Sequence, residues 1–67
     1  MNKFPSILKK LREEKGLNKN ELAKALGIHY TSYYYYELGS VPRQGNLIKI
    51  AKYFDVTVGY LLGEENI

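Results

Sequence analysis

The stretch that decides the fold runs from Glu21 to Gly39 and reads ELAKALGIHYTSYYYYELG. Apolar residues recur at helical spacing on both sides of Gly27, which predicts two short helices joined by a turn. Gly27 suits that turn because a residue without a Cβ adopts positive φ at little cost. Ala23 is small enough to let the second helix approach the first closely. The side chains expected to fill the angle between the two helices are Leu22, Ala23, Leu26, Ile28, Tyr33 and Tyr36.

Three further helices are expected around this pair. The pieces between the Gly and Pro residues have helical periodicity, and no two segments alternate as paired strands would. Asn18, with Glu21 three residues later, matches a capping box at the start of a helix. The sequence therefore predicts an all-α fold in a single domain, residues 1–67. The expected helices span residues 4–15, 18–25, 30–38, 45–54 and 58–62, and a frayed tail is expected at 64–67.

The composition excludes several classes of function. The 67 residues include one His and no Cys, so neither a disulfide nor a thiolate metal site is expected. The sequence also has no Gly-rich phosphate loop, and its residues offer no pairing of a nucleophile with a base. We therefore expect no enzyme, metal, cofactor or small-molecule ligand. No apolar run approaches the ~20 residues of a membrane span, and no signal peptide is recognisable. These features predict a soluble cytoplasmic protein without a membrane partner.

Basic residues outnumber acidic ones along the chain. Ten Lys and Arg stand against seven Asp and Glu, a net charge of +3, and Glu64 and Glu65 lie close to the C-terminal end. A small basic domain fits an anionic partner such as nucleic acid. The alternative is that the Lys residues only solubilise helix faces, so the charge by itself decides nothing.

The spacing E-L-A-x-x-L-G-I-x-x-x-x-Y-x-x-Y-E-x-G over residues 21–39 is that of a helix-turn-helix. Around this motif, the sequence resembles the Cro/phage-repressor class, a lambda-repressor-like, xenobiotic-response-element type of helix-turn-helix domain. The segments that carry the resemblance are LREEKGL (11–17), ELA (21–23), LGI (26–28), Glu37, Gly39, LIKIAKYF (47–54) and YLLG (60–63). It implies a five-helix fold and a sequence-specific, DNA-binding transcriptional regulator, repressor-like and associated with the nucleoid.

The resemblance also identifies residues 30–38 as the recognition helix, which would enter the major groove of double-stranded DNA. At about 100° per residue, Tyr33 and Tyr36 share the inward side of this helix. The outward positions, from which the family reads base edges, are Tyr30, Thr31, Tyr34 and Tyr35.

These outward positions depart from the family, which usually has Gln, Arg, Ser or Asn there. Tyrosine has one hydroxyl and a flat apolar face and cannot make a two-pronged contact with a base. We therefore expect modest direct readout and more reliance on DNA shape and thymine contacts. The alternative is a protein-interaction module, such as an antitoxin, that uses Tyr34 and an exposed Leu38, since Tyr is enriched at protein interfaces.

Four residues are expected at the DNA phosphates. Asn18 and Lys19 open the second helix, where free backbone N–H groups and a cation favour an anion. Asn18 is at the same time the expected cap of this helix, and the two roles are compatible. Ser32 faces sideways on the recognition helix, and Arg43 follows it in the loop at 40–43.

The resemblance further implies an ion pair between Arg12 on the first helix and Glu37 at the end of the recognition helix. Such a pair would fix the recognition helix against the rest of the domain. The alternative is two separate surface charges. His29 stands where the family normally has a capping Ser or Thr, and we expect it to be a weak cap or a phosphate neighbour rather than a metal ligand.

A homodimer on a two-fold operator is expected, because one small domain buries little surface on DNA. The fourth and fifth helices would form its interface. The candidate contacts are Tyr53, Tyr60, Leu62 and Ile67. The alternative for Tyr60 and Leu62 is that they complete the core. A second open alternative is that the chain is the DNA-binding part of a longer protein.

Overall fold

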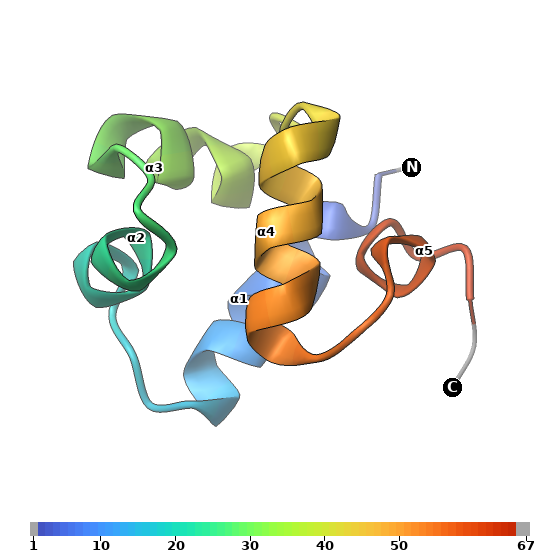
Figure 1. Ribbon diagram of the computed structural model, residues 1–67, viewed down its shortest axis with the longest axis horizontal. Coiled ribbons are helices and arrows are strands. Elements are labelled where there is room, and N and C mark those ends of the chain that lie inside the picture. Colours follow the sequence, from blue (N-terminus) through green and yellow to red (C-terminus); the bar gives the residue numbers. More distant parts are fainter. Residues whose placement is uncertain (1, 66–67) are drawn as a thin grey trace.

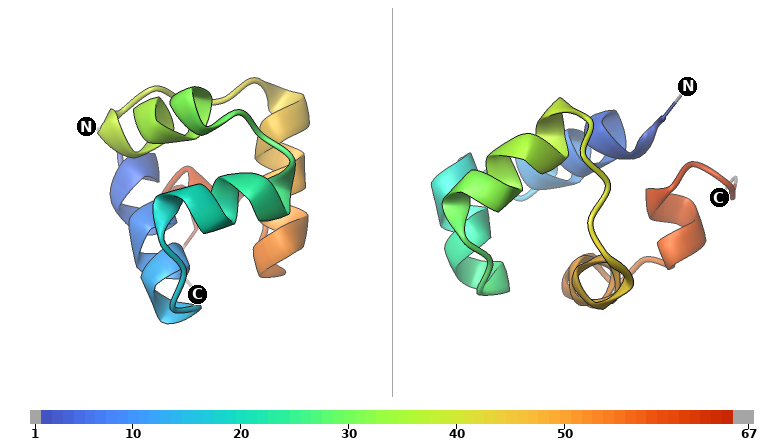
Figure 2. Two further views of the ribbon diagram at one scale, coloured as in Figure 1. Left: turned by 90° about the vertical axis from the view of Figure 1, so that its left-hand side faces the viewer. Right: turned by 90° about the horizontal axis from the view of Figure 1, so that it is seen from above.

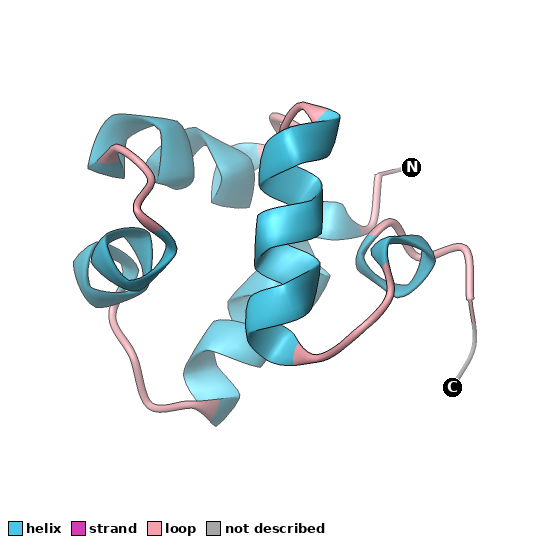
Figure 3. Cartoon of the chain, in the orientation of Figure 1, coloured by secondary structure: helices cyan, strands magenta, loops and turns pink. Residues whose placement is uncertain are grey.

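The computed structural model describes residues 2–65, which form five helices and, within that range, no strand (Figure 1). The helices are α1 (Phe4–Glu14), α2 (Lys19–Leu26), α3 (Tyr30–Leu38), α4 (Gln44–Phe54) and α5 (Val58–Leu61). Short loops connect them (Figure 3). The expected all-α, five-helix fold is confirmed, and every helix begins and ends within one residue of its expected bounds.

The helices are arranged with α1 and α4 in the middle of the molecule, α2 and α3 on one side and α5 on the other (Figure 1). Helix α1 packs against α3 and α5, and α2 packs against α3 and α4. The two outer groups are therefore joined through α1 and α4. Seen from above, α2 and the start of α3 lie at one edge of the molecule (Figure 2, right).

A single core holds these helices together. Its members are Phe4, Leu8, Leu22, Ala23, Leu26, Ile28, Tyr33, Tyr36, Leu47, Ile50, Ala51 and Leu61. All six residues expected in the angle between α2 and α3 belong to it. Tyr36 makes edge contacts with the rings of Phe4 and Tyr33, with centroids 6.4 Å apart in each case. The buried side of α3 is thus aromatic.

The ends of α2 explain its difference from the expected span of 18–25. Asn18 has extended backbone and is the N-cap, so the helix begins at Lys19. The N–H of Glu21 donates to Asn18 Oδ1 and the N–H of Asn18 donates to Glu21 Oε1, both at 2.8 Å, which completes the capping box. The helix continues to Leu26 and ends at Gly27, which has a φ of 67°.

The other helix ends differ from expectation for similar local reasons. Lys15 and Leu62, expected as last helical residues, are the C-caps of α1 and α5. Helix α4 begins at Gln44 rather than at Gly45, because Arg43 already has the extended backbone of an N-cap. Within residues 2–65, no helix is both long and apolar enough to cross a membrane.

Hydrogen bonds connect the described part of the expected tail, residues 64–65, to α5 and its cap. The N–H of Glu64 donates to the carbonyl of Gly59 at 2.9 Å, and Thr57 Oγ1 donates to Glu65 Oε1 at 2.7 Å. These bonds hold Glu64 and Glu65 against α5. Ile67, one of the candidate dimer contacts, lies outside the described residues.

Candidate nucleic-acid interface

Helix α3 is buried on one side and open on the other. Tyr33 and Tyr36 are buried, as the helical rotation per residue predicted. The four residues expected on the opposite face, Tyr30, Thr31, Tyr34 and Tyr35, are all exposed. The helix therefore presents three phenol rings and a threonine to solvent from a rigidly anchored backbone.

The exposed ring of Tyr34 lies close to those of Tyr30 and Tyr35, and we call these three rings the tyrosine ladder. The centroids of Tyr30 and Tyr34 are 6.2 Å apart with the rings tilted, and those of Tyr34 and Tyr35 are 5.6 Å apart with the rings near perpendicular. Lys19 Nζ lies 5.2 Å from the centroid of the Tyr34 ring, a cation–π contact. This contact joins the start of α2 to the open face of α3. Sequence spacing does not reveal it, since the two residues are on different helices.

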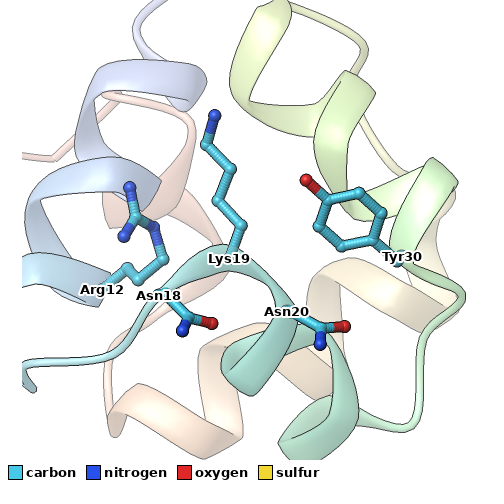
Figure 4. Close-up of a pocket in the computed structure, with 5 residues that line it drawn as sticks. All are labelled: Arg12, Asn18, Lys19, Asn20 and Tyr30. Carbon is cyan, nitrogen blue, oxygen red and sulfur yellow. The ribbon is translucent and has the colours of Figure 1, made fainter.

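An open groove of about 730 Å³ lies between the start of α2 and the start of α3 (Figure 4). Its lining residues are Arg12, Asn18, Lys19, Asn20 and Tyr30. The Lys19 side chain extends between Arg12 and Tyr30, and the Asn18 and Asn20 amides point away from it on the other side of the α2 backbone (Figure 4). Asn20 was not among the expected site residues. Its place in the first turn of α2, next to Asn18 and Lys19, is the signal that could have identified it.

The start of α2 has groups that attract an anion and one that opposes it. The positive end of the helix dipole points out of this N-terminus and Lys19 is the first helical residue, but the Glu21 carboxylate already accepts the N–H of Asn18. Asn18 accepts the N–H of Glu21 through Oδ1, so its Nδ2 group is the part of the amide that can donate outward. The capping role and a phosphate role of Asn18 thus use different atoms.

Arg12 connects three segments beneath this groove. Its Nε donates to Glu37 Oε2 at 2.7 Å and its Nη2 donates to Glu37 Oε1 at 3.3 Å. Its Nη1 donates to the carbonyl of Leu17 at 2.8 Å, just before the cap of α2. Both side chains are almost fully buried, with 10% of Arg12 and 5% of Glu37 exposed. The pair is therefore structural, and it ties α1, the start of α2 and the end of α3 together.

The hydroxyl of Tyr33 is a third member of this network. It donates to Glu37 Oε2, the oxygen that also accepts from Arg12 Nε. Sequence reasoning identified Tyr33 only as a core residue. The four-residue spacing of Tyr33 and Glu37 on one helix is the signal that could have predicted the contact.

The protonation states of this network follow from its contacts. Burial raises the pKa of Tyr33, and the hydrogen bond to Glu37 raises it further, so the hydroxyl keeps its proton. Burial by itself would raise the pKa of Glu37, but the hydrogen bonds from Arg12 and Tyr33 lower it to below its ordinary value. The hydrogen bond to Glu37 raises the pKa of Arg12. Glu37 and Arg12 are consequently both charged at neutral pH.

The remaining expected site residues flank the open face of α3. Ser32 is exposed on the helix itself, and Arg43 is exposed at the N-cap of α4, near the opposite end of α3 from the groove. His29 is the N-cap of α3, and its Nδ1 accepts the N–H of Thr31 at 3.3 Å, a long bond that fits a weak cap. No group of three or more His, Cys, Asp or Glu that could hold a metal ion occurs among residues 2–65.

The expected dimer contacts have mixed surroundings. Tyr53 is 36% exposed, and Lys15 Nζ lies 5.3 Å from the centroid of its ring. Tyr60 and Leu62 are half-buried, and Leu62 packs against the core. Completing the core therefore accounts for part of the role of Leu62.

Comparison with known families and curated proteins points in one direction. A family model described as helix-turn-helix matches residues 8–61. The chain is 45% identical over 65 residues to the uncharacterized HTH-type transcriptional regulator YqaE of Bacillus subtilis (strain 168), covering 94% of this chain and 56% of that protein. It is 32% identical over 62 residues to the cryptic phage CTXphi transcriptional repressor RstR of Vibrio cholerae, covering 91% and 56%.

The fold is also similar to that of a solved structure. A transcriptional regulator from Listeria innocua superposes with a TM-score of 0.85 at 28% sequence identity, covering 100% of this chain and 64% of the other. The chain thus spans little more than half the length of the curated relatives it matches.

Proposed function

Because the chain belongs to the helix-turn-helix family, whose model matches most of its length, we propose that it is a DNA-binding transcriptional regulator of the repressor type. The observation that carries the proposal is the open face of α3, with the Lys19 ammonium at the start of α2 close to one of its exposed rings. A narrow, rigid helix with one exposed face can enter the major groove. Acting on DNA, the protein would work in the cytoplasm at the nucleoid, without catalysis.

In the proposed complex, α3 lies in the major groove. The residues that would contact base edges are Tyr30, Thr31, Tyr34 and Tyr35. The groove between α2 and α3 would receive a phosphate of one DNA strand, with Lys19 and Asn18 Nδ2 as donors. Arg43, beyond the other end of α3, and Ser32 would contact further phosphates. Such contacts position the protein without reading sequence.

We propose further that the protein binds as a homodimer through α4 and α5. Two-fold symmetry would place two copies of α3 about one helical turn of DNA apart, so that each reads half of an inverted repeat. Tyr53 would supply a partly exposed aromatic ring, and Tyr is a residue type enriched at protein interfaces. Tyr60 and Leu62 would contribute their exposed parts.

Selection of bound sequences from random duplex DNA at two salt concentrations tests this function. We expect an inverted repeat to be enriched and affinity to fall steeply with salt, since each neutralised phosphate contributes about −0.9 to the slope of log K against log salt. With about three or four phosphate contacts per domain, the loss is large. Selection of no duplex at either salt concentration contradicts the proposal.

A protein-interaction module is the second candidate, and one observation favours it. Leu38, at the end of α3, is 62% exposed, which makes it the most exposed of the large apolar side chains described. Binding to a protein partner through Leu38 and Tyr34 would depend little on salt. Binding to DNA would depend strongly on it, so the same titration separates the two candidates.

A further inference from the structure

The outward face of α3 has few of the groups that usually read base edges. Residues 30–38 contain no Asn, Gln, Arg, Lys, His or Asp. Glu37, the one charged residue of the helix, is buried against Arg12 and Tyr33. What α3 offers to a base is therefore single hydroxyl groups and apolar surface, which comes from the tyrosine ladder and, at the end of the helix, from Leu38.

The three rings of the ladder differ in how much of their surface is free. Tyr34 has Tyr30 and Tyr35 as ring neighbours and the Lys19 ammonium near its ring, and 38% of it is exposed. Tyr35 is 54% exposed and Tyr30 is 44% exposed. Tyr34 is thus the middle ring of the ladder, and Tyr35 is the most exposed residue of the three.

An apolar ring has one complementary group on the major-groove edge of DNA. Base edges there present hydrogen-bond donors and acceptors, except for the 5-methyl group of thymine. Covering that methyl with ring carbon removes both from water, which is favourable. Cytosine has no such methyl group unless it is methylated at the same ring position.

On the premise of the proposed function, we infer that the tyrosine ladder reads 5-methyl groups of pyrimidines, with Tyr35 as the main contact. The protein would then select sites by their thymine methyls and would accept 5-methylcytosine in place of thymine at a contacted position. Its affinity for a site with cytosine at that position would respond to cytosine methylation.

The contacts within the ladder support this reading in a second way. Because Tyr34 already lies close to both other rings and to Lys19, its side chain has less freedom to lose when DNA binds. Lys19 also lies at the groove proposed for a phosphate, so a bound phosphate and the middle ring of the ladder would share one cation. The phosphate anchor would thereby set the height of the rings above the base edges.

The test replaces methyl groups in the DNA and leaves the protein unchanged. In the selected duplex, each thymine is exchanged singly for deoxyuridine, which differs by the methyl alone. We expect roughly a fourfold weaker binding at each contacted position, the change that one buried methyl-sized group produces. At the same position, 5-methylcytosine paired with guanine should bind more tightly than unmodified cytosine by a similar factor.

Protein variants then identify the ring. Tyr35→Ala should remove the difference between thymine and deoxyuridine, whereas Tyr35→Phe should keep it. Ser32→Ala, on the same helix, is the matched control: it should weaken both duplexes equally and leave their ratio unchanged.

Two results overturn the inference while leaving the proposed function in place. One is equal binding of the thymine and deoxyuridine duplexes by the unaltered protein. The other is a loss of affinity on Tyr35→Ala that is the same for both duplexes, which would assign the ring to the sugar-phosphate backbone. Failure to select any duplex DNA would instead contradict the proposed function itself.

Discussion

Glu37 accepts hydrogen bonds from two side chains of different chemistry, the guanidinium of Arg12 and the phenol of Tyr33. A buried ion pair contributes little net stability, but a pair that loses one partner leaves an uncompensated charge. The phenol adds a donor to the charged oxygen without adding charge. Tyr33 thus helps to hold a carboxylate ionised in a site that burial alone would make unfavourable.

Tyr33→Phe should therefore change the acid stability of the protein. We expect a loss of about 1 kcal/mol at neutral pH from the missing hydrogen bond. The pKa of Glu37 is lowered in the folded state, so its stabilising effect is present above its unfolded value, near 4.5, and is lost as pH falls through the folded value. Without the phenol this folded value rises towards 4.5, so the loss of stability in acid should be smaller and should be complete at a higher pH. Urea unfolding followed between neutral pH and about pH 3 measures both effects.

Tyr36→Phe is the matched control for this experiment. Tyr36 is also buried on α3, and its hydroxyl accepts a hydrogen bond from Asn46 Nδ2 at 2.9 Å rather than donating to Glu37. The Tyr36→Phe variant should lose a similar amount of stability at neutral pH, but the dependence of its stability on pH should be that of the unaltered protein. If both variants shift the profile equally, the phenol of Tyr33 has no special effect on Glu37.

At the scale of the element, the start of α2 combines a cap and a candidate phosphate site. Asn18→Ser should keep the capping oxygen and so cost only a few tenths of a kcal/mol, since Ser and Asn are similar N-caps. It removes the Nδ2 donor, however, and should weaken DNA binding.

Lys19→Ala should leave stability nearly unchanged and reduce the salt slope of DNA binding by about 0.9. Thermal unfolding and salt titrations of DNA binding give the two quantities.

Glu21→Ala separates the two roles from the other direction. It removes the second half of the capping box, whose carboxylate accepts the N–H of Asn18. We expect lower stability but an unchanged salt slope. A reduced slope in this variant, or unaltered DNA binding in Asn18→Ser, would show that the cap and not the amide donor governs the anion site.

The end of α4 contains the one non-Gly residue with positive φ among residues 2–65. Asp55 is the C-cap and has a φ of 57°, whereas Gly fills the comparable position after α2. Left-handed backbone destabilises the folded state by about 1–2 kcal/mol for a residue with a Cβ. Gly avoids this strain, but its greater freedom in the unfolded chain offsets part of the gain in stability. Asp55→Gly should therefore stabilise the protein by about 0.5–1 kcal/mol. Asp55→Ala, tested beside it in urea, should give no gain; equal effects would exclude backbone strain as the cause.

The elements of the fold could be predicted from sequence because their signals are local. Helical spacing gave the five helices, the Asn18–Glu21 spacing gave the capping box, and rotation along α3 separated the inward Tyr33 from the outward Tyr35. These signals lie within one helix and its caps. Where a helix end differs from expectation it does so by one residue, because the boundary depends on the backbone conformation of the cap residue, which the sequence pattern does not fix to a single position.

Contacts between helices were harder to predict from the sequence. The position of Lys19 over Tyr34 depends on the angle at which α2 and α3 cross, and no spacing in the sequence encodes that angle. The groove that includes Asn20 has the same origin. The ion pair of Arg12 and Glu37 was expected only through resemblance to a family. The hydrogen bond of Tyr33 to this pair was not predicted, because the sequence pattern identifies an inward-facing aromatic residue only as part of the core.

At the scale of the whole molecule, the two functions proposed for the domain lie on different helices. The open face of α3 and the start of α2 form one edge, while α5 lies on the opposite side of the central pair of helices (Figure 1). A dimer through α4 and α5 would therefore leave both copies of α3 free. Duplex binding should then gain from the second half-site by avidity, typically a factor of 10² to 10⁴ for two linked sites.

Tyr53→Lys tests this arrangement. Around a two-fold axis an introduced charge faces its own copy, and Lys15 already lies against this ring, so the variant should oppose dimer formation. We expect an intact fold, unchanged affinity for a single half-site, and loss of most of the avidity gain on the full inverted repeat. Val41→Lys adds the same charge at an exposed apolar residue outside α4 and α5 and should keep the dimer in sedimentation measurements. If Tyr53→Lys binds the full repeat as tightly as the unaltered protein does, the interface lies elsewhere, because a lysine pair at a symmetric contact cannot be accommodated without cost.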